Sequence, residues 1–229
     1  MEVNRPKKKK FGWTPNNELL LRLMQSKVSI LTINWVFQGM RGMQSKELSF
    51  RFGLETTLII LLHILVFSNY FEAAASVLVS IFVAHTLNWL LNTHLWVCVR
   101  YFPIYRRNPE VLKSYLNSTE IQINNIRWID SAVCIGSIGD KGDVSSWRTD
   151  IDLRLIFEPG IFNYFRMNFY LIYLRTIALF TIIPLDLYAY NDISYLKNFK
   201  KDEGLMLLKD TANKIVKLYP EKTVYKNNE

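Results

Sequence analysis

The chain is poor in cysteine and histidine, and this scarcity argues against several kinds of site. Among 229 residues there are only Cys98 and Cys134, which fall in segments of different character and lack CxxC spacing. Neither a disulfide framework nor a zinc site is expected. A reducing compartment is the default expectation for the part of the chain outside its apolar segments. The three histidines show no metal-ligand spacing and no Ser–His–Asp order.

No cleavable signal peptide is expected, and the sequence shows no internal repeats. The N-terminus carries a lysine run from Lys7 to Lys10, but no short apolar run with a small-residue cleavage site follows it directly. Residues 1–17 contain prolines and a glycine among polar residues, so they are predicted to form a basic tail.

Hydrophobic residues make up 50% of the chain and aromatic residues 14%, which excludes a disordered protein. The formal net charge is +8, and much of it lies beside apolar segments, in the lysine run and at Arg100, Arg106 and Arg107. Such a distribution is typical of the cytoplasmic surface of a membrane. It could also serve a polyanion, but we favour the membrane and do not expect nucleic acid as a partner.

The first segment after the tail, residues 18–38, has leucines at helical spacing interrupted by charged residues. We expect one amphipathic helix, either on the membrane surface or packed on the domain in the second half of the chain. Residues 39–53 contain three of the glycines and are predicted to be a connection. The tail and this helix together form the predicted region 1–53.

Residues 54–102 predict a helical hairpin in a membrane. The run 54–71 is strongly apolar, and the longer run 73–99 has no formal charge. About 20 helical residues cross the hydrocarbon core, so the second run is long enough and the first is marginal. Lysines and arginines flank the pair, which places both ends in the cytoplasm. The alternative is a buried helix pair in a soluble protein.

One face of the second apolar run carries polar side chains at helical spacing, namely His85, Asn88, Trp89 and Asn92. Polar groups in lipid usually face a partner or a cavity. They could hold a lipid-phosphate headgroup, but hydrogen bonding to a neighbouring helix is the favoured interpretation.

Residues 103–200 predict a domain of class α+β, followed by a C-terminal helix and tail over 201–229. The expected elements are a helix over 110–126, strands over 129–135, 150–157 and 182–190, a helix over 162–180, and a helical stretch over 203–218. One competing interpretation concerns residues 167–183, which are apolar enough to be a third membrane helix. In that case Asp186 would lie across the membrane from Asp150 and Asp152.

The candidate chemistry rests on three aspartates in predicted strands. Asp150 and Asp152 are two residues apart, so they point to the same face of their strand. Asp186 lies between two leucines in the later strand, and the three can converge if the two strands are neighbours. Carboxylate oxygens suit Mg²⁺ or Mn²⁺. Three carboxylates can hold two such ions and clamp the oxygens of a phosphoryl transfer.

A small-residue segment directly after the first strand could approach a phosphate. Gly136, Ser137 and Gly139 leave room for backbone N–H groups, and Ser137 adds a hydroxyl donor. Lys141 and Arg148 are the nearby cations, although a solvated loop would explain them equally well.

Two neighbouring residues have structural explanations as well as functional ones. Trp147 could stack on a base, although simple packing is the more frequent role of tryptophan. Arg154 is expected to form a structural ion pair with a carboxylate rather than to bind a phosphate.

A Gly-Ser pair, a polar spacer, an Asp-x-Asp and a later strand aspartate together resemble the DNA polymerase beta-like nucleotidyltransferase superfamily. The resemblance covers about residues 110–190, and the spacer is longer and more polar than in the smallest members. It implies a mixed sheet with helices, binding of a nucleoside triphosphate at Gly136 and Ser137, and metal ligation by Asp150, Asp152 and Asp186. The implied reaction is transfer of a nucleoside monophosphate with release of pyrophosphate.

The acceptor is not implied by the resemblance, because acceptors in the superfamily range from nucleic acid to small molecules. The apolar hairpin favours a membrane-borne one, such as a lipid-linked sugar or a glycan precursor. Two rival hypotheses stay open. A glycosyltransferase would use the Asp-x-Asp for a nucleotide-sugar, leaving Gly136, Ser137 and Asp186 unexplained. A non-catalytic subunit of a membrane complex would not need all three aspartates.

Overall fold

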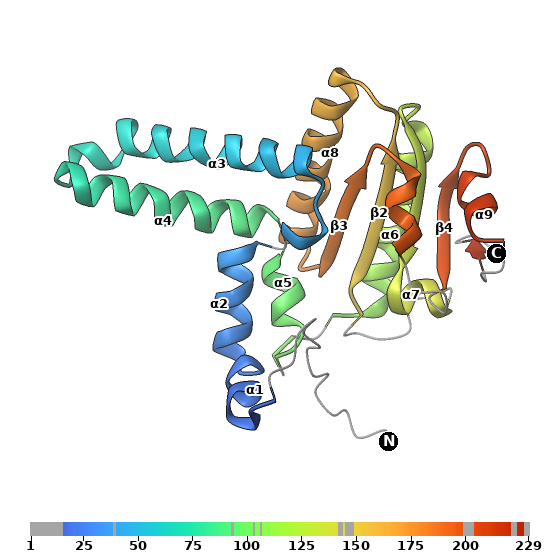
Figure 1. The fold of residues 1–229 in the computed structure, drawn as a ribbon, viewed down its shortest axis with the longest axis horizontal. Coiled ribbons are helices and arrows are strands. Elements are labelled where there is room, and N and C mark those ends of the chain that lie inside the picture. Colours follow the sequence, from blue (N-terminus) through green and yellow to red (C-terminus); the bar gives the residue numbers. More distant parts are fainter. Residues whose placement is uncertain are drawn as a thin grey trace.

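A helical hairpin projects from a mixed α+β body in the computed structural model of the chain (Figure 1). The structure describes residues 16–38, 40–92, 94–102, 104–105, 107–141, 144, 149–198, 204–220 and 224–226.

The N-terminal segment forms two short helices rather than the single helix that we predicted. These are α1 (Glu18–Met24) and α2 (Lys27–Phe37). The chain breaks between them because the Ser26 hydroxyl accepts a hydrogen bond from the backbone N–H of Ser29, capping α2. The Trp35 indole donates to Thr86 Oγ1 at 3.2 Å. The second helix therefore packs against the hairpin.

The hairpin consists of α3 (Ser45–Leu65) and α4 (Ala73–Leu91), joined by the short 3-10 helix η2 (Phe67–Asn69). Most of the predicted connection over 39–53 is wrong, because α3 already begins at Ser45 after the 3-10 helix η1 (Met40–Gly42). The predicted boundary between residues 53 and 54 thus falls inside α3. The second apolar run is also interrupted, since α5 (His94–Val99) follows α4 as a separate helix.

Both hairpin helices are long and apolar enough to cross a membrane. The spans Ser45–Asn69 and Ala73–Leu91 have mean hydropathies of 1.8 and 1.7, and 6% and 28% of their apolar windows are buried within the protein. At about 1.5 Å per residue, the 19 residues of α4 extend roughly 28 Å, close to the thickness of a hydrocarbon core.

The polar face of α4 makes helix–helix hydrogen bonds, as the sequence analysis favoured. His85 Nδ1 lies 2.7 Å from a carboxylate oxygen of Glu55 on α3, and the Asn88 amide donates to the other oxygen at 2.8 Å. The Trp89 indole donates to Asn34 Oδ1 on α2 at 2.9 Å. These bonds satisfy the polar groups inside an otherwise apolar hairpin.

The body is built on a five-stranded mixed sheet with the order β3-β2-β1-β4-β5. The strands are β1 (Ile129–Ile135), β2 (Ile151–Phe157), β3 (Leu185–Tyr190), β4 (Leu205–Asp210) and β5 (Val224–Lys226). β1 pairs antiparallel with both β2 and β4, and β2 pairs parallel with β3. The first three strands and the mixed α+β class agree with the prediction.

The predicted C-terminal helix over 203–218 is wrong, because its apolar half is strand β4 and only α9 (Lys214–Leu218) is helical. Strand β4 pairs with β1, and its Leu205, Met206 and Leu208 are buried in the core. Asp210 ends the strand, since its carboxylate accepts hydrogen bonds from the backbone N–H groups of Lys214 and Ile215 at 2.8 and 3.0 Å.

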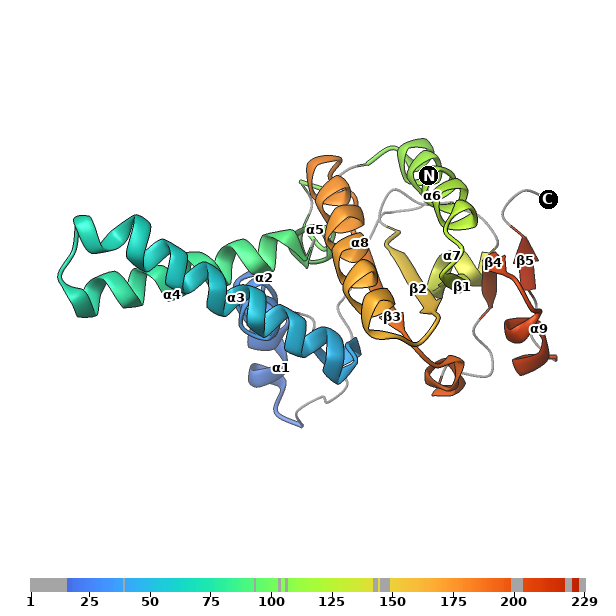
Figure 2. The ribbon, with the colours of Figure 1, turned by 90° about the horizontal axis from the view of Figure 1, so that it is seen from above.

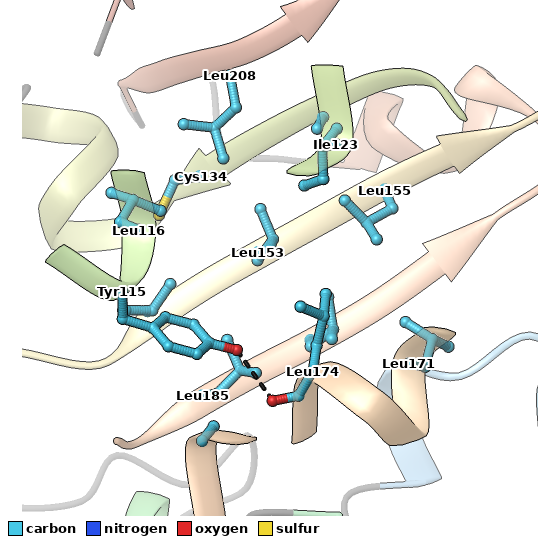
Figure 3. Packing of buried hydrophobic residues seen from close by; sticks show 14 of the residues in the cluster. Tyr115, Leu116, Ile123, Cys134, Leu153, Leu155, Leu171, Leu174, Leu185 and Leu208 are labelled. Carbon is cyan, nitrogen blue, oxygen red and sulfur yellow. Dashed lines mark hydrogen bonds between the residues drawn. The ribbon is translucent and has the colours of Figure 1, made fainter. Parts of the chain in front are cut away.

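Two helices, α6 (Pro109–Asn125) and α8 (Ile161–Phe180), cover one face of the sheet (Figure 2). Leucines and isoleucines from both helices meet the strands there, and the Tyr115 hydroxyl donates to the Leu174 carbonyl at 3.0 Å (Figure 3). A smaller cluster on the opposite face includes Ile156, Tyr188 and Leu196, the last from the 3-10 helix η3 (Ile193–Asn198). This face carries less helical cover.

Candidate functional site

The strand pairing brings two of the predicted aspartates side by side. Asp152 and Asp186 are register partners in the parallel pair β2–β3, and Asp152 is also the register partner of Ile135 at the end of β1. Asp150 directly precedes β2 and is 7% exposed. Three neighbouring strand ends therefore meet where the sequence placed its candidate site.

The site opens on the face of the sheet opposite to α6 and α8. Strand side chains alternate between faces, and Ile156 and Tyr188 belong to the smaller cluster on that face. Asp152 and Asp186 each lie an even number of residues from them, so they share it. The intervening Leu153 and Leu187 enter the larger core beneath α8.

The competing interpretation of residues 167–183 as a third membrane helix does not fit the structure. Most of that segment belongs to α8, which buries Leu171 and Leu174 against the sheet. Within the described residues, the only spans that pass by length and composition are those of the hairpin. Asp186 consequently lies beside Asp152 rather than across a membrane from it.

Gly136 joins β1 to the short helix α7 (Gly136–Lys141), where we had predicted a loop. Its φ of 69° lies in the left-handed region. A Cβ atom here would lie 2.5 Å from Asp152 Oδ2. Glycine is therefore required here for two reasons: the backbone conformation is left-handed, and a side chain would clash with the Asp152 carboxylate. The Gly-Ser pair and the Asp-x-Asp are adjacent in space.

Ser137 is the next residue of α7, and its hydroxyl oxygen is buried without a hydrogen-bond partner among the described residues. A buried hydroxyl that lacks a partner is unusual in a folded protein. Gly139 has a different role from the phosphate approach that we considered. A Cβ atom on Gly204 would lie 2.5 Å from the Gly139 carbonyl oxygen, so these glycines let α7 pack against the segment before β4.

Two arginines accompany the aspartates. Arg154 donates to Asp186 Oδ2 at 3.0 Å and to the Asp186 carbonyl at 2.7 Å, which confirms the predicted structural pairing. Arg100 forms an ion pair with Asp150. Burial alone would lower the pKa of Arg100, but Asp150 and Tyr101 outweigh it, so the pKa is raised and the guanidinium stays charged.

The sequence analysis assigned Arg100 to the basic charge of the membrane surface and missed this contact. Arg100 follows α5 and is 8% exposed. Its Nε has no hydrogen-bond partner among the described residues, although the atom is buried. The only signal in the sequence was an arginine at the end of a long uncharged run.

Burial of Asp152, together with repulsion among the carboxylates, determines the electrostatics of the site. Burial, followed by the charges of Asp150 and Asp186, raises the pKa of Asp152 well above its usual range, while Arg154 and Arg100 oppose the shift. A divalent cation would relieve this repulsion, and carboxylate oxygens are the ligands that Mg²⁺ and Mn²⁺ prefer. The donor set therefore fits such an ion.

The aspartates are not already gathered around a metal position. In the part of the chain that the structure describes, no group of three or more His, Cys, Asp or Glu side chains has that arrangement. Two of the carboxylates are instead turned to arginines. Binding a cation would require these side chains to rotate away from the guanidinium groups.

The remaining predicted residues cannot be placed in the site. The side chain of Lys141 and the whole of Trp147 and Arg148 lie outside the described residues.

Comparison with known proteins adds no relative. No family model, no curated protein and no solved structure matches the chain.

Proposed function

We propose that the chain is a metal-dependent nucleotidyltransferase that acts at a membrane. It would move a nucleoside monophosphate from a nucleoside triphosphate to a membrane-associated acceptor and release pyrophosphate. The observation that supports this best is the meeting of Gly136 with Asp152, the register partner of Asp186. A glycosyltransferase that used only an Asp-x-Asp would need neither Gly136 nor Asp186.

In this proposal, Asp150, Asp152 and Asp186 hold one or two Mg²⁺ or Mn²⁺ ions. The ions would polarise the phosphoryl oxygens and screen the charge of the leaving pyrophosphate. An acceptor hydroxyl oxygen forms the new bond to the α-phosphorus as the bond to pyrophosphate breaks, and the hydroxyl proton passes to solvent. The protein contributes position and charge, because phosphoryl transfer depends mainly on both.

The arginines have a second use once a cation takes over their carboxylates. Arg100 and Arg154 are each 8% exposed and paired with Asp150 and Asp186. A guanidinium released from a carboxylate is well suited to bind a phosphate through two parallel N–H groups. Arg100 and Arg154 would then neutralise the triphosphate in the place of the partners that they lose.

The hairpin supports the membrane location and the orientation. From Phe52 to Val99 the sequence has no lysine or arginine, whereas Lys46, Arg51 and Arg100 lie at the base of the hairpin. Positive charge collects on the cytoplasmic side of membrane helices, so the body with its site would lie in the cytoplasm. An anchored transferase suits a lipid-linked sugar or a glycan precursor as acceptor.

The direct test is binding of each nucleoside triphosphate to the detergent-purified chain, with Mg²⁺ or Mn²⁺ and with chelator. We expect metal-dependent binding by the wild type and none by the Asp150→Asn/Asp152→Asn variant, because two of the three carboxylates are neutralised. An Asp130→Asn variant is the matched control, since Asp130 pairs with Lys214 at 2.7 Å away from the site. Absence of triphosphate binding to folded wild type would refute the proposal and favour nucleotide-sugars.

Ser137 offers a finer test of the same site. Its hydroxyl has no partner to lose among the described residues, so Ser137→Ala should leave the melting temperature close to that of the wild type. A hydrogen bond to a charged phosphate contributes about 1.5–3 kcal/mol, so triphosphate affinity should fall by about tenfold or more. Equal affinities of Ser137→Ala and wild type in calorimetric titrations would remove Ser137 from the binding site.

A further inference from the structure

The outer face of α8 is apolar although no part of the described protein covers it. Its exposed positions include Phe162, Phe169 and Phe180, whose exposed fractions are 77%, 62% and 81%. The other exposed residues of this helix are Ile161, Phe165, Arg166 and Tyr173. A single arginine is therefore the only charged side chain on the exposed face of α8. We call the exposed residues the α8 aromatic face.

Helix α6 shows what is expected of a helix in this position. It covers the same face of the sheet, but its exposed positions are polar apart from Ile121: Glu110, Lys113, Ser114, Ser118, Asn124 and Asn125. A helix that packs on a core and faces water has such a polar outer side. The apolar side chains of α8 therefore reflect a different environment rather than a requirement of the fold.

The α8 aromatic face is continuous with the hairpin. Phe50 of α3 makes edge-to-face contacts with Phe165 and Phe169, with ring centroids 6.4 and 5.6 Å apart. The Tyr164 hydroxyl donates to the Lys46 carbonyl at 2.5 Å, at the base of α3. These contacts join the α8 aromatic face directly to the base of the hairpin.

The two elements also have a fixed mutual orientation. Helix α8 crosses the base of the hairpin and does not continue along its length (Figure 1). The Arg175 guanidinium of α8 donates a hydrogen bond to the buried Glu47 carboxylate of α3 at 2.9 Å, which fixes the two helices relative to each other. A hairpin that enters a bilayer along the membrane normal would thus lay α8 along the membrane surface.

We infer that the α8 aromatic face rests in the interfacial layer of the same bilayer that the hairpin enters. This inference depends on membrane insertion of the hairpin, as proposed above, and adds a second contact with the lipid. Aromatic rings are enriched at the level of the lipid headgroups, and Arg166 can extend its guanidinium to the phosphates while its stem stays apolar. This combination of rings and one cation suits a lipid surface.

Contact through α8 also determines how the catalytic body approaches the lipid. Strand β3, which carries Asp186, is the edge strand of the sheet and packs against α8 and α5. With α8 on the headgroups, β3 is the part of the sheet closest to the bilayer. Asp186 on this edge strand would then lie near the membrane surface, on the side of the sheet turned away from α8, within reach of an acceptor held at that surface.

Site-directed spin labels can test this contact without an activity assay. The two native cysteines are buried, so Phe169→Cys, Leu78→Cys and Ile121→Cys can be labelled one at a time. Leu78 lies on the exposed side of α4, and Ile121 on α6 is 65% exposed, which matches the 62% of Phe169. The full chain is placed in vesicles of phosphatidylcholine with a minority of phosphatidylglycerol. Collision rates with lipid-soluble oxygen and a water-soluble nickel chelate are then measured.

We expect the ratio of oxygen to nickel collisions at Phe169 to be several-fold higher than at Ile121 and below that at Leu78. A ratio at Phe169 equal to that at Ile121, with Leu78 in lipid, would overturn the inference and leave membrane insertion intact. Low ratios at all three positions would refute insertion itself. A protected Phe169 label that is inaccessible to both reagents would indicate a second copy or another protein on this face, and would also overturn the inference.

Discussion

In metal-free buffer, the Asp152→Asn variant should unfold at a higher temperature than the wild type, although it loses metal-dependent triphosphate binding. Burial and the charges of Asp150 and Asp186 disfavour the ionised Asp152 carboxylate in the folded protein. Asparagine keeps the shape of the side chain and removes that repulsion. A residue whose removal stabilises the protein is retained for what it binds, as expected of a ligand for a cation.

The difference in stability between Asp152→Asn and the wild type depends on pH because the pKa of Asp152 is raised in the folded protein. In the unfolded chain the carboxyl ionises near its ordinary pKa of about 3.9. In the folded protein it holds its proton to a higher pH. The wild type therefore loses stability as the pH rises from the unfolded pKa through the raised folded value. The advantage of Asp152→Asn should be small below pH of about 4 and grow as the pH rises toward the raised pKa of the folded protein.

Thermal melts with chelator at acidic and neutral pH measure this difference. Adding Mg²⁺ or Mn²⁺ should raise the melting temperature of the wild type and not that of Asp152→Asn, because only a bound ligand stabilises the folded state. A variant less stable than the wild type at every pH would contradict the prediction. Asp152 would then serve mainly as a structural partner of Arg154 and Arg100.

The geometry around the aspartates was predictable from the sequence because it depends on local rules. Period-two alternation over Asp150–Phe157 and around Asp186 predicted strands, and a strand places residues two apart on one face. The same rule failed at Leu205–Leu208, where consecutive apolar residues fit a helix or a fully buried strand equally well. Only the pairing with β1 decides between the two.

Long-range contacts were beyond any local pattern. Arg100 lies 50 residues from Asp150, and its charge looked like an ordinary flank of an apolar segment. The start of α3 was missed because three glycines, the last of them Gly53, suggested a connection. In the structure Glu47 and Arg51 of this segment are buried, and Glu47 pairs with Arg175 of α8, which binds the hairpin to the body.

We expect Glu47→Gln to cause the largest loss of stability among single substitutions outside the core. Glu47 is 4% exposed and accepts hydrogen bonds from Arg51 at 3.0 Å and Arg175 at 2.9 Å. Without its charge, two buried guanidinium groups lack a counter-ion. Breaking a buried ion pair in this way costs about 3–5 kcal/mol. In a chain of this size that corresponds to a melting temperature lower by roughly 10 °C.

Glu18→Gln provides the matched control, because Glu18 pairs with Arg22 at 2.7 Å while both side chains are about three-quarters exposed, at 77% and 74%. Exposed pairs contribute little, so this variant should melt with the wild type. We call Glu47, Arg51 and Arg175 the Glu47 cluster. Similar small losses of stability in both variants would mean that water reaches this cluster and screens its charges.

The Glu47 cluster also joins the two parts of the molecule, since Glu47 lies on α3 and Arg175 on α8. Loss of the Glu47 charge should therefore loosen the attachment of the hairpin to the body, as well as destabilise the protein. Spin labels at Leu78→Cys and Ile121→Cys, placed together, would report this as a broader distance distribution in Glu47→Gln than in the wild-type background. An unchanged distribution would assign the fixed orientation to the aromatic contacts of Phe50 instead. In either case, contact of the α8 aromatic face with lipid requires that the hairpin and the sheet move as one rigid body.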